Sequence, residues 1–397
     1  MKIAERISRL GTETAFAVSA EAAAFAAGGN TVYPFHLGDI NLITPATVRE
    51  AAIKAMQEGK TGYCPNTGIP PLREALAEDV SAARQVQYSV ENVVIQPGGK
   101  PTIGKFFMAL MNPGDEVLYP NPGYPIYESQ IEFHGGVARP YRYVEGSEDF
   151  EIDLDMLSAQ ISPRTRLLVL NDLQNPTGAE CSPGDMERLA QLVVDNDLYV
   201  LCDEAYFDIR FSGQSTSLAS LPGMRERCVI LYTFSKKFAM TGWRLGASIG
   251  PRKLIEVIAK LNINDESCAN HFIQYGALAG LTGDQSEVRQ NLDILKQRRD
   301  LAVDLLNRIE GVRCYRPNAT FYLFANVTGA MARKGLTDVD QFRRQLLHQT
   351  GVSVCTRNHF GRPLEEESEA YIRLAYSGID APDIEKGLSR FKAFIEE

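Results

Sequence analysis

The chain has 397 residues, 44% of them hydrophobic and 23% charged, a composition that excludes a disordered chain and gives enough length for two or three domains. Lys and Arg number 41 against 50 Asp and Glu, and the net charge of −9 disfavours binding to nucleic acid or to an anionic membrane surface. No apolar run reaches the roughly 20 residues of a membrane-spanning helix, and the N-terminus lacks a signal-peptide core, so we expect a cytoplasmic protein.

The cysteines and histidines do not predict a metal site. The seven cysteines are dispersed without a C-x-x-C pair, and the five histidines fall in no metal motif. Cys202 and Cys228 lie in apolar runs and are expected in the core.

Five short apolar runs predict β-strands that are buried on both faces. They are Val93–Gln96, Glu116–Tyr119, Arg166–Leu170, Leu198–Cys202 and Val229–Tyr232. Between the third and fourth runs, Ser182 and Pro183 begin an amphipathic helix that is expected to extend to Val194. This alternation predicts an α/β fold with a mainly parallel central sheet flanked by helices, and such sheets bind ligands beyond the carboxyl ends of their strands.

Glycines and an aromatic residue follow the first two predicted strands. Gly98, Gly99 and Lys100 open a helix, where backbone N–H groups can cradle an anion; a flexible turn is the alternative. Tyr124 is flanked by prolines and can form a flat wall for a planar ligand, or it can simply pack in a turn.

The next two strands are followed by an amide, a carboxylate and a phenol. Asn175 stands in an Asn-Pro-Thr-Gly turn, from which it can also donate an N–H to a ligand. Asp203 follows an all-apolar strand and needs a cation there, such as a metal, a buried Arg or a protonated ring nitrogen; it could otherwise be a capping residue. Tyr206 comes three residues later.

The fifth strand leads into a segment that contains Thr233, Lys236 and Arg244. A lysine so close to a buried strand can have a lowered pKa and act as an imine-forming nucleophile, whereas a pair of solvated lysines is the alternative. Together the strand ends supply a phosphate cradle, an aromatic wall, an amide, an anion, a phenol and an imine lysine. This combination indicates a pyridoxal phosphate (PLP) site.

The last part of the chain has a different pattern. Residues 286–312 predict one long helix, followed by strands at Tyr322–Phe324, Val352–Val354 and Tyr371–Leu374 and by a final helix from Ala381. We therefore expect three parts: an N-terminal arm with part of the small domain (1–46), a large PLP-binding domain (47–285) and a C-terminal small α+β domain (286–397).

Over essentially its whole length the chain resembles the fold-type-I PLP-dependent aminotransferases of class I/II, the aspartate aminotransferase superfamily. Ser235-Lys236 followed by Gly242-Trp243-Arg244-Leu245-Gly246 is similar to the family's lysine signature. Thr233 replaces the usual Ser or Gly but keeps a hydroxyl.

The resemblance implies roles for the cofactor residues. Lys236 would form the internal aldimine and then shuttle a proton, Asp203 would pair with the ring nitrogen, and Tyr124 would stack on the ring. Asn175 and Tyr206 would bond the ring oxygen. The phosphate would be surrounded by Gly98, Gly99, Lys100, Thr233 and Arg244.

The resemblance also implies substrate and subunit contacts. Arg373, Gly38 and Asn175 would hold the substrate α-carboxylate. Tyr63 would reach the phosphate of the neighbouring subunit's cofactor, which implies a homodimer with composite sites.

Two loops depart from the family pattern. Gly38-Asp39-Ile40-Asn41-Leu42 lacks the usual proline and one acid, and Cys355–Gly361 lacks the usual Pro-Gly. Arg357 or His359 could contact a substrate side chain, although solvated loop residues are the favoured interpretation. Because no second arginine or lysine matches those of dicarboxylate-specific members, specificity for aspartate or glutamate is not expected.

The leading hypothesis is an aminotransferase (EC 2.6.1 type) that moves an amino group between an L-amino acid and a 2-oxo acid. An alternative keeps the site and changes the reaction: a lyase, an elimination like that of aminocyclopropane-carboxylate synthase, an oxidase or a specialised biosynthetic enzyme. A regulatory PLP-binding domain is a third hypothesis, disfavoured because the chain has no room for a DNA-binding module and is negatively charged.

Overall fold

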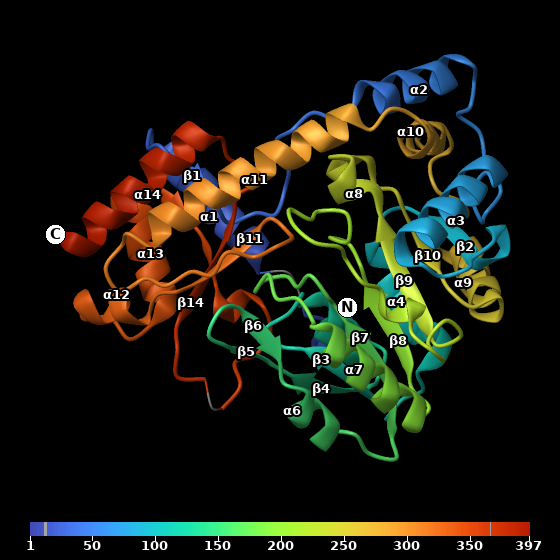
Figure 1. Ribbon diagram of the computed structural model, residues 1–397, viewed down its shortest axis with the longest axis horizontal. Coiled ribbons are helices and arrows are strands. Elements are labelled where there is room, and N and C mark those ends of the chain that lie inside the picture. Colours follow the sequence, from blue (N-terminus) through green and yellow to red (C-terminus); the bar gives the residue numbers. More distant parts are fainter. Residues whose placement is uncertain (12–13, 366) are drawn as a thin grey trace.

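The computed structural model describes residues 1–11, 14–365 and 367–397; residues 12–13 and 366, within the predicted arm and small domain, lie outside the described residues (Figure 1). Its main sheet has seven strands in the order β2-β10-β9-β8-β7-β3-β4. Their bounds are β2 (Val93–Gln96), β3 (Glu116–Pro120), β4 (Val137–Tyr141), β7 (Thr165–Leu170), β8 (Tyr199–Asp203), β9 (Cys228–Thr233) and β10 (Gly246–Ile249). Strand β10 is antiparallel to both of its neighbours, whereas β4, β3, β7, β8 and β9 pair in parallel.

The five strands predicted from apolar runs are confirmed to within a residue or two at each end. Burial explains their composition, since Leu168, Val200 and Ile230 of the central strands are completely inaccessible to solvent. Cys202 and Cys228 are buried in the core as expected.

Strands β4 and β10 were not predicted. Strand β4 contains Arg139 and Pro140, which are compatible with its position at the edge of the sheet. Strand β10 is only four residues long and contains Gly246 and Ser248, so its apolar signal is weak.

Helices cover both faces of the main sheet (Figure 1). One face packs against α4 (Lys100–Leu110), α5 (Ile126–Phe133) and α9 (Arg252–Asp265). The other packs against α2 (Ala46–Gln57), α3 (Pro70–Arg84), α7 (Pro183–Asp195) and α10 (His271–Thr282). The predicted α7 is confirmed, and Ser182 caps it by accepting a hydrogen bond from the Asp185 backbone N–H.

A second, small sheet lies beside the main one. It has three antiparallel strands in the order β11-β14-β13, with bounds β11 (Tyr322–Asn326), β13 (Cys355–Thr356) and β14 (Tyr371–Ala375). The parallel pair β1 (Tyr33–Pro34) and β12 (Val352–Ser353) lies next to it. Its helices are α11 (Ser286–Leu306), α12 (Thr328–Arg333), α13 (Val339–Thr350) and α14 (Ala381–Glu396). Strands β11, β12 and β14 and helix α14 match the predicted strands and final helix.

The long helix predicted to reach residue 312 is too long, because α11 ends at Leu306. The Asn307 side chain bonds both the backbone N–H and the carbonyl of Cys314, and Gly311 adopts a positive φ of 79°. These contacts turn the chain back toward β11 instead of continuing the helix.

The remaining elements lie outside these two groups. They are α1 (Ala15–Ala27), the hairpin β5 (Tyr143–Glu145) and β6 (Phe150–Ile152), α6 (Leu154–Ala159), α8 (Phe234–Lys237) and the 3₁₀ helices η1 (Glu5–Arg9), η2 (Val90–Asn92), η3 (Leu218–Ser220), η4 (Thr241–Trp243) and η5 (Arg357–His359).

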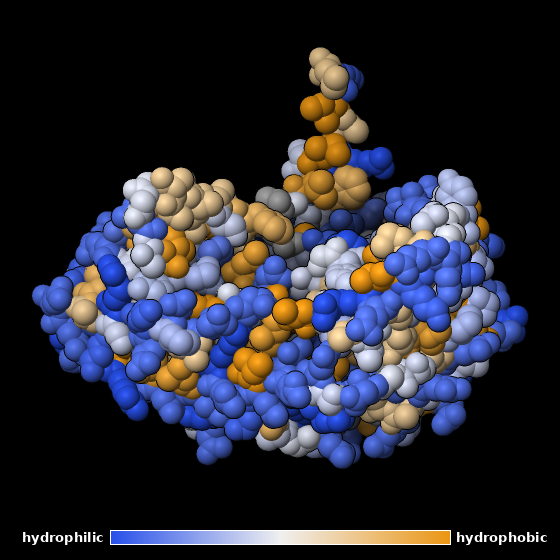
Figure 2. Space-filling view, turned by 90° about the horizontal axis from the view of Figure 1, so that it is seen from above, coloured by the Kyte–Doolittle hydropathy of each residue, from blue (hydrophilic) through white to orange (hydrophobic). Residues whose placement is uncertain are grey.

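The N-terminal residues 1–11 are exposed throughout and project from the body as a narrow column (Figure 2). Its apolar side chains Met1, Ile3, Ile7 and Leu10 face solvent. Over the described parts of the chain, no helix has the length and apolar character needed to span a membrane.

Candidate active site

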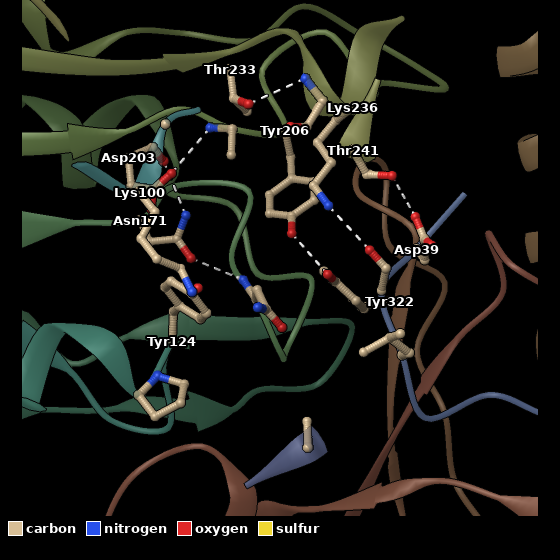
Figure 3. A pocket seen from close by; sticks show the side chains of 18 of the residues that line it. Asp39, Lys100, Tyr124, Asn171, Asp203, Tyr206, Thr233, Lys236, Thr241 and Tyr322 are labelled. Atoms are coloured by element: carbon tan, nitrogen blue, oxygen red, sulfur yellow. Dashed lines mark hydrogen bonds between the residues drawn. The ribbon is translucent and has the colours of Figure 1, made fainter. Parts of the chain in front are cut away.

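A cavity of about 670 Å³ lies where strands β7, β8 and β9 end (Figure 3). Tyr322 of β11 and Arg373 of β14 also line it, so the cavity is closed by the small sheet. Residues expected at the site from sequence line it together: Gly38, Gly99, Lys100, Tyr124, Asn175, Asp203, Tyr206, Thr233, Lys236, Arg244 and Arg373. The fold thus gathers residues from both ends of the chain at one edge of the main sheet.

Lys236 belongs to the one-turn helix α8, which follows β9 directly and is capped by Thr233. Its Nζ donates a hydrogen bond to the Gly38 carbonyl oxygen at 3.1 Å and lies 5.2 Å from the Phe321 ring centroid. Burial lowers the pKa of Lys236 to about 8; Arg373 and Arg244 also lower it, whereas Asp39 and Asp203 oppose the shift. The amine is therefore far closer to its neutral, nucleophilic form near neutral pH than an exposed lysine is.

Asp203 ends strand β8 and is almost completely buried. Its Oδ2 accepts a hydrogen bond from the Tyr127 hydroxyl at 2.6 Å, and its Oδ1 accepts one from the Ala205 backbone N–H at 3.2 Å. Burial raises the pKa of the Asp203 carboxyl to about 6, although the Tyr127 hydrogen bond acts in the opposite direction. A cationic partner in the cavity would keep this carboxylate charged.

The start of helix α4 forms a concave backbone surface. Gly98 has a positive φ of 102°, and a Cβ there would lie 2.3 Å from Nη2 of Arg244. A Cβ on Gly99, the N-cap residue, would lie 2.6 Å from Cδ2 of Leu231. This close packing of guanidinium against glycine at a helix N-terminus suits a phosphate.

Arg373 lies between two aromatic rings, 4.5 Å from the Tyr322 ring centroid and 4.7 Å from that of Phe360. Its Nη2 donates to the His36 carbonyl oxygen at 2.6 Å and its Nη1 to Oδ1 of Asn175 at 3.2 Å. Its Nε is buried and has no hydrogen-bond partner among the described residues. Two neutral oxygens thus hold the guanidinium in place, and neither of them supplies the negative charge that a carboxylate would.

The residues that line the cavity but were not predicted from the sequence include Tyr127, Asn171 and Tyr322. Tyr322 hydrogen-bonds Tyr206 through their hydroxyls at 2.8 Å, and Asn171 accepts a hydrogen bond from the Asn175 backbone N–H at 3.1 Å (Figure 3). Asn171 follows a buried strand and Tyr127 lies one helical turn after Tyr124, so strand-end position and spacing could have identified both. Tyr322 carries no such signal, because only the packing of the two sheets brings it to Tyr206.

Two expected residues do not line the cavity. Gly98 lies behind Gly99 against Arg244. Tyr63 is 90% exposed and lies outside the cavity, so within one chain it does not contribute to the site.

The favoured interpretation of Arg357 as a solvated loop residue is wrong. Its side chain is buried, forms an ion pair with Glu367 and donates to Oδ1 of Asn121 at 2.6 Å. These partners hold it away from the cavity, since a buried guanidinium needs its acceptors nearby. His359 does line the cavity, and its Nδ1 accepts a hydrogen bond from the Thr356 backbone N–H at 3.1 Å.

Pyridoxal phosphate carries an aldehyde, a basic ring nitrogen and a phosphate, and the cavity offers a fitting group for each. Lys236 is an amine of lowered pKa, and Asp203 is a buried carboxylate with no ion-pair partner among the described residues. The Gly98–Gly99 turn packs so closely on Arg244 and Leu231 that neither glycine has room for a Cβ, which brings the Arg244 guanidinium to the start of α4. The class of protein that this fold and cavity define is therefore the PLP-dependent enzymes.

Comparison with known proteins narrows the class to a family. The chain belongs to the class I and II aminotransferases, whose family model matches residues 33–391. It is 32% identical to an aspartate aminotransferase from Geobacillus stearothermophilus and 33% identical to a probable aspartate/prephenate aminotransferase from Aquifex aeolicus, in both cases over 100% of this chain and 99% of the relative. The structure of an aspartate aminotransferase from Thermus thermophilus with maleate superimposes with a TM-score of 0.90 at 29% identity, covering 99% of both chains.

The chain is accordingly a fold-type-I aminotransferase of EC 2.6.1 type. It uses pyridoxal phosphate and acts on amino acid and 2-oxo acid substrates.

We expect Gly38→Ala to damage the site, because a Cβ at this position would lie 2.1 Å from the Tyr322 hydroxyl and break its bond to Tyr206. The specificity constant kcat/KM should fall about a hundredfold, and the free energy of unfolding should fall by about 1–3 kcal/mol. Steady-state kinetics and denaturant titration measure both, with Gly184→Ala in α7, where the nearest atom is 3.8 Å away, as the control. Wild-type kinetics in Gly38→Ala would contradict the described packing.

The pKa of Lys236 in the cofactor-free chain should lie near 8 instead of 10.5, since burial disfavours its charged form. The amine should react fully above that pH and progressively less below it as it becomes protonated. Competitive acetylation against a model lysine, quantified by mass spectrometry across pH, measures this value. Arg373→Met should raise the pKa, because Arg373 lowers it; a wild-type value near 10.5 would refute the account.

Proposed function

We propose that Lys236 and Asp203 carry the transfer of an amino group between an L-amino acid and a 2-oxo acid, with Lys236 as the proton carrier. The observation that supports this proposal most directly is that both side chains line one cavity with the arginine Arg373, while burial shifts their two pKa values toward one another. A group that titrates near pH 8 is matched to proton transfer close to neutral pH.

When bound, pyridoxal phosphate supplies an aldehyde that condenses with primary amines and a ring that accepts an electron pair. The Lys236 amine holds the cofactor covalently and then takes up and returns the substrate Cα proton. The Asp203 carboxylate keeps a proton on the ring nitrogen, and the Tyr127 hydroxyl fixes its orientation.

Other lining residues orient the cofactor. The Tyr124 ring would stack on the cofactor ring, and Asn175 and Tyr206 would donate hydrogen bonds to its phenolic oxygen. The residues that hold the phosphate are Gly98, Gly99, Lys100, Thr233 and Arg244.

Arg373 binds the substrate α-carboxylate with the help of Gly38 and Asn175. The His36 carbonyl and Asn175 already orient the Arg373 guanidinium, so the Arg373 side chain loses little conformational freedom when the substrate binds. The carboxylate aligns the substrate so that the Cα proton faces the Lys236 amine, which donates to the adjacent Gly38 carbonyl.

We further propose a homodimer in which Tyr63 completes the partner's phosphate site. Support comes from its exposure outside the cavity and from apolar side chains that face solvent, among them Ile53 and Met56 of α2 and those of the N-terminal column. Covering such side chains in a second copy would bury apolar surface.

We also propose that the chain is divided as predicted, into an N-terminal arm with part of the small domain (1–46), a large domain (47–285) and a C-terminal small domain (286–397). This division is supported by a buried cluster around the small sheet, which includes Tyr33, Leu346 and Ile372 and which Leu173 and Tyr206 of the large domain join. A cytoplasmic location stays a prediction.

The apolar cavity wall beside Arg373 indicates which substrate side chains the enzyme prefers. Ala15 and Phe16 of α1 line the cavity together with Phe360, and Ala15 packs against the buried cluster to which Phe360 belongs. We propose that amino acids with apolar or aromatic side chains are bound against this wall.

Lys236→Ala should abolish transfer, with kcat lower by about a thousandfold or more, because the variant lacks the amine that would hold the cofactor and move the proton. Oxo acid and the aminated cofactor are measured after mixing the holoenzyme with single amino acids, with Lys260→Ala on the surface as the control. Ammonia or peroxide released without oxo acid transfer would favour the lyase or oxidase alternatives. Retained turnover in Lys236→Ala would contradict the assignment.

Phe16→Ala should reduce kcat/KM about tenfold for phenylalanine and less for alanine, since it removes apolar contact surface near the side chain only. Steady-state kinetics with the two donors measures the ratio. An equal change for both donors would show that Phe16 does not contact the substrate side chain.

A further inference from the structure

Two pairs of consecutive residues connect the cavity to a buried ion cluster behind it. Lys236 and Asp203 line the cavity, whereas their neighbours Lys237 and Glu204 do not. Asp203 ends a strand and Glu204 follows it, so their side chains leave on opposite faces. Lys236 and Lys237 lie on the single turn α8 and also diverge.

Glu204 is held by an arginine from helix α3. Nε of Arg84 donates to Oε2 of Glu204 at 2.5 Å, and the Ser217 hydroxyl donates to Oε1. The Arg84 side chain is completely inaccessible, and its guanidinium stacks 3.9 Å from the Phe207 ring centroid. An ion pair so enclosed has little freedom to change its geometry.

Lys237 is held by the same helix. Its Nζ lies 3.5 Å from Oδ1 of Asp79, which is on α3, and 3.3 Å from Oδ1 of Asp208, which follows β8. Asp79 and Arg84 thus connect one helix to the residues that directly follow Asp203 and Lys236 in sequence.

Water has little access to the Arg84–Glu204 pair, whereas the side chains around Lys237 are partly exposed, Asp79 by 25% and Asp208 by 24%. Both Nη atoms of Arg84, Oδ2 of Asp79 and the hydroxyl of Tyr232 are buried and have no hydrogen-bond partner among the described residues. The charges of Arg84 and Glu204 interact strongly because solvent does not screen them, and the charges around Lys237 are screened in part. Movement of α3 would therefore be transmitted to both ion pairs.

We propose that helix α3 acts through Asp79 and Arg84 as a brace that sets the position of the Lys236 amine relative to the Asp203 carboxylate, with Lys237 and Glu204 as positioning residues. This inference rests on the proposed function, since it concerns the two side chains to which that function is assigned. None of the four residues of the brace touches the cavity, so their effect on the reaction is indirect.

Asp79→Asn separates a positioning effect from a direct effect of charge. The charged groups that act on Lys236 itself are Asp39, Arg373, Arg244 and Asp203, and the variant leaves all of them in place. Removing an anion would by its charge alone lower the pKa of a nearby lysine, whereas loosening α8 would let the amine reach water and raise its pKa.

We expect Asp79→Asn to raise the pKa of Lys236 in the cofactor-free full chain by about half a unit or more, measured by competitive acetylation. In the holoenzyme, kcat should fall about tenfold while KM for the amino acid changes less than about threefold, because the carboxylate anchor Arg373 is untouched. Asp79→Glu, which keeps the charge, should restore most of both values.

Lys105→Met is the matched control, because Lys105 is a buried lysine of α4 that pairs with Glu266 just after the end of α9, and neither residue belongs to the brace. It should cost stability without changing the pKa of Lys236. Should Asp79→Asn fail to fold, Asp208→Asn removes the other carboxylate that faces Lys237, on a residue outside helix α3, and is expected to act in the same direction.

A lowered or unchanged pKa of Lys236 in the folded variants, together with wild-type kcat, would overturn the brace. Failure of the proposed function can be distinguished from failure of the brace. A wild-type holoenzyme without transfer activity would refute the proposed function, whatever the pKa of Lys236 in the cofactor-free chain.

Discussion

The removal of water from one lysine amine and one carboxylate in the same cavity is the constraint on which the rest of the site depends. Burial lowers the pKa of Lys236 and raises that of Asp203, so each becomes able to exchange a proton near neutral pH. A strand end and a one-turn helix hold the two groups, and neither element can shift without disturbing the core of the main sheet. Catalytic chemistry and fold stability are in this way coupled through a few buried contacts.

The second requirement is that two sheets meet over the cavity. Arg373 comes from the small sheet, Asn175 from a loop of the main one and the His36 carbonyl from the segment between β1 and α2, yet all three are joined by hydrogen bonds. Tyr322 and Tyr206 make a further link between the sheets. The site for the substrate carboxylate and the site for the cofactor thus belong to one hydrogen-bond network. A change in either sheet therefore affects both sites.

Sequence reasoning succeeded where the signal is local. Buried strands are apolar runs, and a polar residue just after such a run marks the sheet edge, which is how Asp203 and Lys236 were found together. It failed where contacts depend on distant packing: Tyr322 reaches the cavity only because β11 approaches Tyr206, and Arg357 is buried because Glu367 and Asn121 meet it across a loop. The end of α11 at Leu306 depends likewise on a contact between Asn307 and Cys314 that no helical periodicity contains.

The most direct test of the central claim is to locate the covalent bond between chain and cofactor. The purified holoenzyme is reduced with borohydride, digested and analysed by tandem mass spectrometry, which separates neighbouring lysines by their fragments. The account predicts a pyridoxyl phosphate adduct on Lys236 alone, because this lysine lines the cavity and has the lowered pKa. An adduct on Lys237 or Lys100, or none at all, would contradict it.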